Sequence, residues 1–319
     1  MCIALFCFDH PVYSVILCSN RDEFLHRATT HARFHNFEIK IPGDDDEATP
    51  EKPGDVLSGR DLVAGGTWLG INRKGRIAVL TNITEEYQTW PTSRGDLPHN
   101  FLNPPANKFE TLDDYVRHLT TPPSDSYAGF NLLLAAPSKG GIDNFEVTRL
   151  TNSGGGGPIT ARSLRDNERA HGGMSNGVDG AAEGEWRKVI EGSEKLQKIL
   201  EVGLDEDGMI QATFDALSIC RTPPQTRQQL RTSIMIPPLL IPITGKVPPG
   251  GNEPPVPDPV TKEIGLWYAT RLSTVLLVKK TGEVTFVERD IWALDPDTQQ
   301  PVHCGTNKDR ITRFQLEVI

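Results

Sequence analysis

The stretch Met1-Cys2-Ile3-Ala4-Leu5-Phe6-Cys7-Phe8 opens the chain, and the interpretation of the remaining sequence depends on it. Its pattern predicts a strand in which Cys2, Ala4 and Phe6 face one side of a sheet and the residues between them face the other. Because both sets are apolar, the strand is expected to lie in a sheet that is covered on both faces. A turn follows at residues 9–11, and residues 12–19 form a second predicted strand, so the chain begins with a hairpin.

Cys2 is a candidate nucleophile because it directly follows the initiator methionine. Cysteine is small enough for an aminopeptidase to remove the methionine before it, and Cys2 would then carry a thiol and a free α-amine. The amine titrates near ~8 and the thiol near ~8.5, so the amine can take the thiol proton close to neutral pH. A nucleophile assisted by an N-terminal amine is an established catalytic arrangement. The alternative is that Cys2 is a small buried residue at a chain end.

A dense polar cluster, Asn20-Arg21-Asp22-Glu23, ends the second strand. Two strands of similar length joined by a short turn bring their outer ends together, so the hairpin would return this cluster to Cys2. We therefore predict a functional site at this end of the hairpin. The alternative is a solvated turn that opens a loop.

The composition limits the class of protein. A chain of 319 residues with 37% hydrophobic residues can build a substantial core, and 29 glycines and 25 prolines indicate long loops. The net charge of −9 and the pI of about 5.4 argue against nucleic acid or an anionic membrane as the main partner. The sequence lacks both a run of about 18 apolar residues and the charged start of a signal peptide, so neither a transmembrane helix nor a signal peptide is expected.

Neither a metal site nor a cofactor is expected. The five cysteines are odd in number and lack metal-ligand spacing, which fits a reduced cytosolic setting. His26, His31 and His35 have no helical pattern that would place them on one face, so they are interpreted as loop residues, with a metal or haem site as the weaker alternative.

Two asparagines are candidate donors to a developing negative charge. Residues 62–72 and 75–82 predict a hairpin that ends at Asn82. Asn176 lies in a glycine-rich turn, residues 172–177, that follows another expected strand. A side-chain amide in either place can donate to an oxyanion. The alternative in each case is an ordinary turn residue.

The other elements follow from periodicity. Apolar residues at helical spacing predict helices over 111–120, with Thr111 as N-cap, 186–200 and 209–217. Buried strands are predicted over 127–136, 146–150, 272–280 and 283–288, with Arg271 at the entrance of the last pair. Loops without regular structure are predicted at the acidic residues 42–55, at the proline-rich residues 222–260, and after the last hairpin. This order predicts a single α+β domain over residues 1–319, with antiparallel sheets stacked between helical layers.

The chain resembles the NRDE family, which is the transport and Golgi organisation protein 2 family. The resemblance is carried, in the family's order, by Cys2, Asn20-Arg21-Asp22-Glu23, Gly65-Gly66-Thr67-Trp68-Leu69-Gly70, Leu80-Thr81-Asn82, Gly129-Phe130-Asn131-Leu132-Leu133, Ser175-Asn176-Gly177 and Tyr268-Ala269-Thr270-Arg271. That family is similar to the N-terminal-nucleophile hydrolases, especially the choloylglycine hydrolase and penicillin acylase group. The resemblance implies a four-layer αββα sandwich with mostly antiparallel sheets.

The resemblance also implies roles for individual residues. Cys2 matches the nucleophile and Asp22 the aspartate that orients its amine. Asn82 and Asn176 match the asparagines of the oxyanion hole and amine network, and Arg271 matches the arginine that completes the site. One position departs: these hydrolases carry Arg-Asn-x-Asp, whereas this chain has Ser19-Asn20-Arg21-Asp22. The shift predicts that the arginine points away from the usual place.

Three functions fit these observations. The chain could be an amidohydrolase or acyltransferase in which Cys2 attacks an amide or thioester. It could be a carrier of a hydrophobic acid-bearing ligand, such as an acyl-CoA or haem, as the resemblance implies. It could also be an interaction protein that supports Golgi organisation and secretion. We favour the second and third, which are compatible, and expect a cytoplasmic protein whose contact with Golgi or mitochondrial membranes is peripheral.

Overall fold

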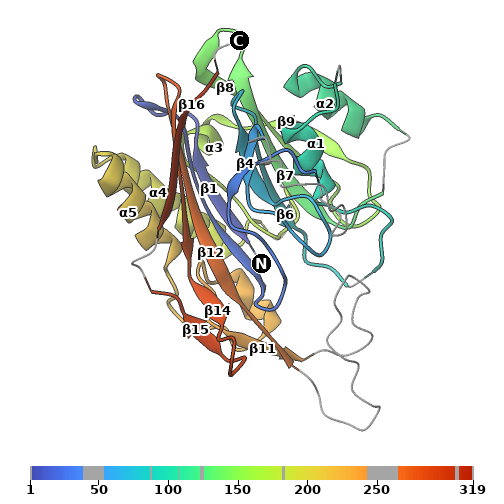
Figure 1. The fold of residues 1–319 in the computed structure, drawn as a ribbon, viewed down its shortest axis with the longest axis vertical. Helices are drawn as coiled ribbons and strands as arrows, with labels where there is room; N and C mark the ends of the chain where they lie inside the picture. Colours follow the sequence, from blue (N-terminus) through green and yellow to red (C-terminus); the bar gives the residue numbers. More distant parts are fainter. Residues whose placement is uncertain are drawn as a thin grey trace, which may run out of the picture.

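Two antiparallel sheets pack face to face at the centre of the molecule, and helices cover the outer side of each sheet (Figure 1). This computed structural model describes residues 2–38, 54–86, 88–106, 108–122, 126–181, 184–242, 265–305 and 309–317. Most of the expected acidic loop at 42–55, and residues 243–260 of the proline-rich segment, lie outside the described residues.

The first sheet contains the N-terminal hairpin. Its strands, from one edge to the other, are β10 (Gly172–Met174), β1 (Ile3–Cys7), β2 (Tyr13–Phe24), β12 (Gly265–Lys279), β13 (Glu283–Asp290) and β16 (Arg310–Gln315), with β11 (Leu239–Pro242) paired to β12. Each neighbouring pair is antiparallel. The long strand β12 lies beside β2 over most of the length of β2, so it carries C-terminal residues to the motif cluster.

The second sheet is formed by the middle of the chain. Its strands follow one another in sequence order as β3 (Arg33–His35), β4 (Val56–Ser58), β5 (Leu69–Asn72), β6 (Ile77–Asn82), β7 (Phe130–Ser138), β8 (Gly141–Thr151) and β9 (Thr160–Ser163). A separate small hairpin pairs β14 (Trp292–Leu294) with β15 (Pro301–His303). The second sheet therefore winds as a simple meander, whereas the first sheet joins strands that are far apart in the sequence.

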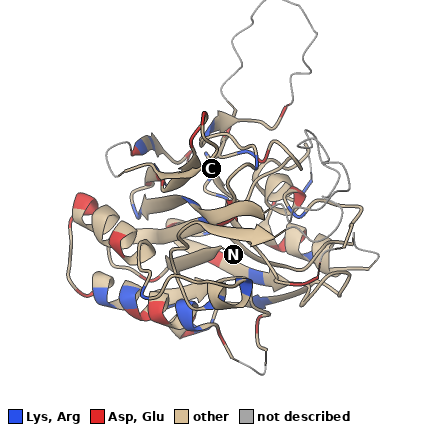
Figure 2. Ribbon diagram, turned by 90° about the horizontal axis from the view of Figure 1, so that it is seen from below, with Lys and Arg blue, Asp and Glu red and all other residues tan. Residues whose placement is uncertain are grey.

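Helices form the two outer layers. Their bounds are α1 (Asp96–Leu102), α2 (Leu112–Thr120), α3 (Asp166–His171), α4 (Arg187–Leu200), α5 (Glu206–Leu217) and the 3₁₀ helix η1 (Arg227–Arg231). The apolar stripes of α4 and α5 pack on the first sheet, and those of α1 and α2 pack on the second. Charged residues gather on helices and loops at the outside, while the strands between them are mostly uncharged (Figure 2). The α2 N-cap is Thr111, as predicted, and its side chain accepts from the backbone N–H of Asp114.

Three apolar clusters separate four layers. One lies between the sheets and includes Ala4 and Phe6 of β1. A second lies between the first sheet and its helices and includes Ile3 and Leu5. The third lies between the second sheet and α1 and α2. The predicted alternation of β1 and the predicted αββα sandwich are both confirmed.

Several predicted boundaries are wrong for identifiable reasons. Residues 62–68 form turns and not a strand, because Gly65 and Gly66 adopt positive φ angles. Within the proline-rich segment, residues 227–231 form η1 and residues 239–242 form β11, an edge strand in which a proline is tolerated. The region after β13 is not irregular, because β16 pairs with the otherwise free edge of β13.

Removal of the Phe6 ring tests the layer between the sheets. Phe6 is fully buried in that layer, so Phe6→Ala should lower the free energy of unfolding by about 3–5 kcal/mol. The control Val12→Ala, at an exposed position in the turn of the same hairpin, should change it by less than about 0.5 kcal/mol. Urea unfolding followed by circular dichroism measures both values, and similar values for the two variants would contradict the assigned layer.

Candidate functional site

Cys2 lies one residue before β1, beside the polar cluster of β2. Ile3 pairs with Asn20, which brings Cys2 level with Arg21 on the neighbouring strand. The Cys2 side chain is half-buried, and its Sγ is a weak donor to the Asp22 carbonyl oxygen at 3.9 Å. Burial raises the pKa of the Cys2 thiol, so the thiol is protonated at neutral pH. The hairpin thus returns the polar cluster to Cys2, as the sequence predicted.

The four motif residues lie inside β2, not in a turn beyond it. Successive side chains of a strand point to opposite faces. Asn20 and Asp22 therefore point to the helix side of the first sheet, whereas Arg21 shares with Cys2 the side that faces the second sheet. The side chains of this one motif therefore enter both the helix layer and the layer between the two sheets.

Asn20 is a structural residue. Its side chain is fully buried, and its Nδ2 donates to the carbonyl oxygens of Leu217 at 2.8 Å and Ile234 at 3.0 Å. Its Oδ1 accepts from the Ser273 hydroxyl at 2.6 Å. These three bonds tie β2 to the end of α5, to the segment before β11 and to β12, and they leave no amide proton of Asn20 for a ligand.

Arg21 presents an unusual buried cation. Its guanidinium lies 4.1 Å from the centre of the Trp68 ring, and the residue is only 4% exposed. Within the described ranges its Nη1 has no hydrogen-bond partner. The expectation that the shifted arginine points elsewhere is wrong. In the hydrolase motif the arginine stands three residues before the aspartate, and in this chain it stands one residue before Asp22. These two positions differ by two residues and so face the same side of a strand, which keeps Arg21 on the Cys2 side.

Asp22 is held by hydroxyl groups and by a buried lysine. Its Oδ1 accepts from the Thr270 hydroxyl at 2.6 Å, and its backbone oxygen accepts from the Tyr268 hydroxyl at 2.9 Å. Its Oδ2 lies 3.9 Å from Nζ of Lys188 on α4. Burial raises the pKa of Asp22 and outweighs the lowering by the amino terminus, Lys188 and Thr270.

Lys188 is a site residue that the sequence analysis missed. It is fully buried, and burial lowers its pKa although the charge of Asp22 opposes this. The helical periodicity of the sequence does indicate its burial, because Lys188 lies on the same helix face as Gly192, Leu196 and Ile199, which are all buried. Ile190, an apolar residue of the same predicted helix, is 47% exposed and does not belong to this stripe.

Arg271 lies at an irregularity of β12. The pairing register with β2 shifts between Thr270 and Leu272, so Arg271 is the extra residue of a bulge. Its Nη1 donates to the Arg27 carbonyl oxygen. Burial lowers the pKa of Arg271 to about 10, and the positive charge of Arg21 adds to this effect. Two guanidinium groups therefore lie within electrostatic reach of each other on this side of the first sheet.

Glu23 and Arg94 complete the charged surroundings. Glu23 is half-buried, and its Oε1 accepts from the backbone N–H of Phe24 at 2.9 Å. Arg94 precedes α1, and its Nη1 donates to the Gly129 carbonyl oxygen at 2.9 Å. Burial lowers the pKa of Arg94, while Glu23 and Cys2 are among the groups whose negative charge would raise it. Nothing in the sequence pattern marked Arg94.

The two candidate amide donors are neighbours. Asn82 ends β6, and Nδ2 of Asn176 donates to its carbonyl oxygen. The backbone N–H of Thr84 donates to the Asn176 carbonyl at 3.0 Å. Ser175, one residue earlier, donates its hydroxyl to the Cys2 carbonyl oxygen at 2.6 Å. The segment with Asn176 therefore contacts both the strand that ends at Asn82 and the residue at the start of β1.

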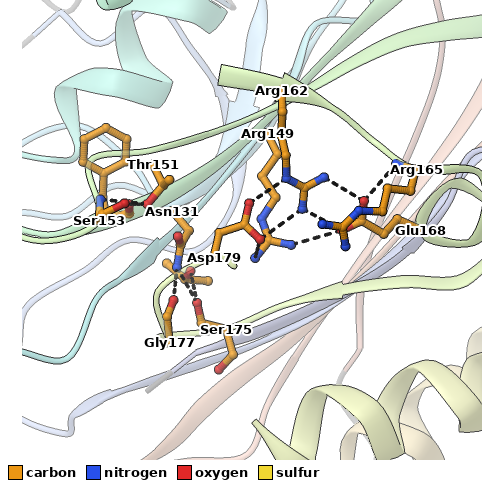
Figure 3. A network of polar contacts seen from close by, with 12 residues as sticks. Asn131, Arg149, Thr151, Ser153, Arg162, Arg165, Glu168, Ser175, Gly177 and Asp179 are labelled. Atoms are coloured by element: carbon orange, nitrogen blue, oxygen red, sulfur yellow. Dashed lines mark hydrogen bonds and ion pairs between the residues drawn. The ribbon is translucent and has the colours of Figure 1, made fainter. Parts of the chain in front are cut away.

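Asn131 fixes that segment from the second sheet (Figure 3). It is fully buried on β7, and its Nδ2 donates to the carbonyl oxygens of Ser175 at 2.9 Å and Gly177 at 2.7 Å. These residues flank Asn176, so the two bonds hold the backbone on both sides of the candidate donor. The sequence analysis placed Asn131 in a buried strand and in the family resemblance, but gave it no role.

Two arginines hold the same segment further along (Figure 3). Arg162 of β9 donates from Nε to Asp179 at 2.7 Å and from its Nη atoms to Glu168 at 2.7 Å. Arg149 of β8 is 5% exposed and lies 3.4 Å from Asp179. Burial favours the neutral form of Asp179, but the hydrogen bond from Arg162 and the charge of Arg149 outweigh this effect and lower the pKa of Asp179. The positive charges of the two arginines therefore compensate the carboxylates of Asp179 and Glu168, as is required for buried charges.

Other kinds of site were sought in the same ranges. No group of three or more His, Cys, Asp and Glu side chains in the described part of the chain could hold a metal ion. A hollow of about 660 Å³ lies by Asp9, Phe145 and Arg169, at the opposite end of β1 from Cys2, and none of the predicted site residues lines it. Among the described helices, none is long and apolar enough to cross a bilayer.

Comparisons with known proteins agree with the sequence resemblance. A family model described as Transport and Golgi organisation 2 matches residues 1–293. A Transport and Golgi organization protein 2 homolog of Bos taurus is 30% identical over 93% of this chain and 95% of that protein. The Mus musculus homolog is 28% identical over 94% and 96%. A penicillin V acylase structure from Agrobacterium tumefaciens gives a TM-score of 0.48 at 14% identity, over 93% of this chain and 84% of that one.

Removal of the Asn131 donor tests how the Asn176 segment is held. Asn131→Asp replaces Nδ2 by an oxygen and leaves two buried carbonyl groups without this donor, which should cost about 2–5 kcal/mol of unfolding free energy. Hydrogen exchange should accelerate at residues 175–178 more than elsewhere. The control Asn144→Asp, at an exposed position, should leave both quantities unchanged. Exchange that rises evenly over the whole protein would contradict a local role.

Proposed function

The chain belongs to the Transport and Golgi organisation 2 family, and from that premise we propose that it binds a hydrophobic acyl-type ligand with a negatively charged group at the Cys2 end of the sandwich. Acyl-CoA and haem are ligands of this chemistry. Binding would take place in the cytoplasm, in support of Golgi organisation, protein secretion and lipid homeostasis, with any membrane contact peripheral.

The observation that carries the proposal is the state of Arg21. A buried guanidinium without an acceptor for one of its Nη groups is destabilising, because its hydration has been lost and not fully replaced. A carboxylate or phosphate oxygen of a ligand would supply the missing acceptor and a compensating charge. Stacking on Trp68 orients the guanidinium before any ligand arrives, which reduces the entropy lost on binding.

Nearby charges support an anionic group. Arg271 lies close enough to Arg21 for their like charges to oppose each other, and a bound anion would relieve this repulsion. Arg94 also lies within electrostatic reach of Cys2. The thiol itself is kept in its neutral form by burial, which suits a binding site better than a site with a resting thiolate.

A partly exposed apolar cluster lies on the helix side of β2, opposite the face that carries Arg21. Tyr268, whose hydroxyl binds the Asp22 carbonyl, packs with Leu230 and Ile236. Around them lie partly buried apolar side chains, namely Phe24, Trp186, Leu239 and Ile241. The hydrocarbon portion of a ligand would pack against these side chains where it passes the end of β2, with its anionic portion at Arg21.

The second candidate is an N-terminal-cysteine amidohydrolase or acyltransferase. It is favoured by the convergence of Cys2, Asp22, Asn82 and Asn176 at one end of the sandwich. After removal of Met1, the α-amine of Cys2 would take the thiol proton, sulfur would bond to the carbonyl carbon, and the C–N or C–S bond would break as the leaving amine or thiol received that proton. Water, or an acceptor in an acyltransferase, would then displace the acyl group from sulfur. Each oxyanion donor would contribute about 3 kcal/mol to transition-state stabilisation.

Substitution of Cys2 separates the two candidates. A carrier with Cys2→Ala should bind palmitoyl-CoA or haem within about twofold of the natural affinity, because sulfur supplies little of the binding energy. A hydrolase with Cys2→Ala should lose all turnover of an acylated substrate. Isothermal titration measures the first property, and release of free acid from an N-acyl amide or acyl-CoA measures the second. Absence of binding of both ligands by the natural protein would contradict the carrier.

Substitution of Arg21 tests the anion contact. Arg21→Met keeps much of the side-chain volume but removes the charge-assisted bond, worth about 1.5–3 kcal/mol, so palmitoyl-CoA affinity should fall at least about tenfold. The matched control is Arg73→Met, because Arg73 stacks on Phe34 at the same 4.1 Å but lies outside the site. The Arg73 variant should bind normally. Equal losses in the two variants, measured by titration calorimetry, would argue against Arg21 as the anion contact.

A further inference from the structure

A buried ion pair lies on the helix side of the first sheet, close to Cys2. Lys188 and Asp22 both have side chains that are fully buried, with Nζ and Oδ2 separated by 3.9 Å. The Lys188 ammonium also lies 5.9 Å from the centre of the Trp186 ring. Removal of both charges from water is costly, and replacement of such a pair by apolar residues is often neutral or stabilising. Fold stability alone therefore gives a weak reason for a lysine at this position.

The ion pair is linked to the thiol through one residue. The backbone oxygen of Asp22 accepts from Cys2 Sγ at 3.9 Å, and the Asp22 side chain contacts Lys188. The negative charge of Cys2 would favour the charged form of Lys188, so the two groups are within electrostatic reach of each other. By linkage, a charged Lys188 favours the Cys2 thiolate by the same interaction.

Other charged groups also face the thiol and must be considered. The amino terminus of the chain and Arg21 on β2 favour the thiolate, and the charge of Asp22 disfavours it. Arg94, before α1, adds a further positive charge within reach of Cys2, and Glu23 lies near Arg94. Lys188 differs from these groups because it comes from the helix layer and lies 3.9 Å from Oδ2 of Asp22, the residue whose charge disfavours the thiolate.

We propose that Lys188 is a positioning residue that acts through Asp22 to set the ionisation of the Cys2 thiol from inside the fold. An N-terminal nucleophile normally depends on its own α-amine for activation, and that amine exists on Cys2 only after Met1 is removed. Lys188 supplies a positive charge that is present in both forms of the chain. The inference rests on the second candidate function, the N-terminal-cysteine enzyme, only in taking Cys2 as a functional thiol.

The charges predict opposite effects for the two members of the ion pair. Without Lys188, less of the Asp22 negative charge is compensated, so the pKa of the Cys2 thiol should rise. Without the Asp22 charge, the lysine acts alone, so the pKa of the thiol should fall. A purely structural role of the ion pair predicts shifts of the same sign for both variants, because loss of either residue would loosen the same site and change the exposure of Cys2 in the same direction.

The experiment is a pH profile of Cys2 alkylation. The full-length protein, whose N-terminal state is established by intact mass, is treated with limiting iodoacetamide between pH 6 and 10, and each cysteine is followed by peptide mapping. Lys188→Met should slow Cys2 alkylation at pH 7.5 by about tenfold, which corresponds to a rise of about one pKa unit. Asp22→Asn should accelerate alkylation at that pH, and Lys188→Arg should retain the natural profile.

Controls are present within the same molecule. Cys220 is half-buried and Cys304 exposed, and their alkylation rates should not differ among the variants. Lys279→Met removes a lysine that pairs with Glu206 and Glu283 at the surface, and it should leave the Cys2 profile unchanged. An unchanged profile in Lys188→Met, or shifts of the same sign in Lys188→Met and Asp22→Asn, would overturn the inference. If Lys188→Met does not fold, failure of Asp22→Asn to lower the alkylation midpoint would overturn it.

The alkylation experiment tests the role of Lys188 separately from the proposed ligand binding. Opposite shifts with no binding of palmitoyl-CoA or haem would retain the role of Lys188 and refute the proposed carrier. Normal ligand binding with no shifts would retain the carrier and refute the role of Lys188.

Discussion

The antiparallel register of β1, β2 and β12 is the constraint on which the site depends. Ile3 pairs with Asn20, and on the other side of β2, Asp22 pairs with Thr270. These two pairings bring residues from both ends of the chain to the same end of one sheet. A slip of one residue in either pairing would exchange the faces of Arg21 and Asp22, because strand side chains alternate. The bonds of Asn20 to three separate segments oppose such a slip.

The second constraint is the segment that joins the two sheets after β10. Its residues bind Cys2 on the first sheet and are held by side chains of β7, β8 and β9 on the second. The distance between the sheets at the site is therefore set by polar bonds, while elsewhere it is set by the packing of apolar side chains. This explains why so many buried polar groups gather at one end of an otherwise apolar sandwich.

The sequence predicted those features that depend on local periodicity. The alternation of β1, the Thr111 cap and the approach of the polar cluster to Cys2 all follow from short-range rules. The placement of Lys188 did not, because a lysine in an amphipathic helix is usually exposed and its burial depends on a carboxylate from a distant strand. The bulge at Arg271 and the edge strands β11 and β16 were also missed, because they depend on partners that no local pattern specifies.

The alternation of β2 has a mechanical consequence. Arg21 and Asp22 are joined by one peptide bond, yet one packs toward the second sheet and the other toward α4. Because the two side chains point to opposite faces of the sheet, a small rotation of the strand about its own axis would move them in opposite directions. The layer between the sheets and the helix layer are thus mechanically coupled through a single backbone, and a displacement of Arg21 reaches the helix layer without any chain of intermediate contacts.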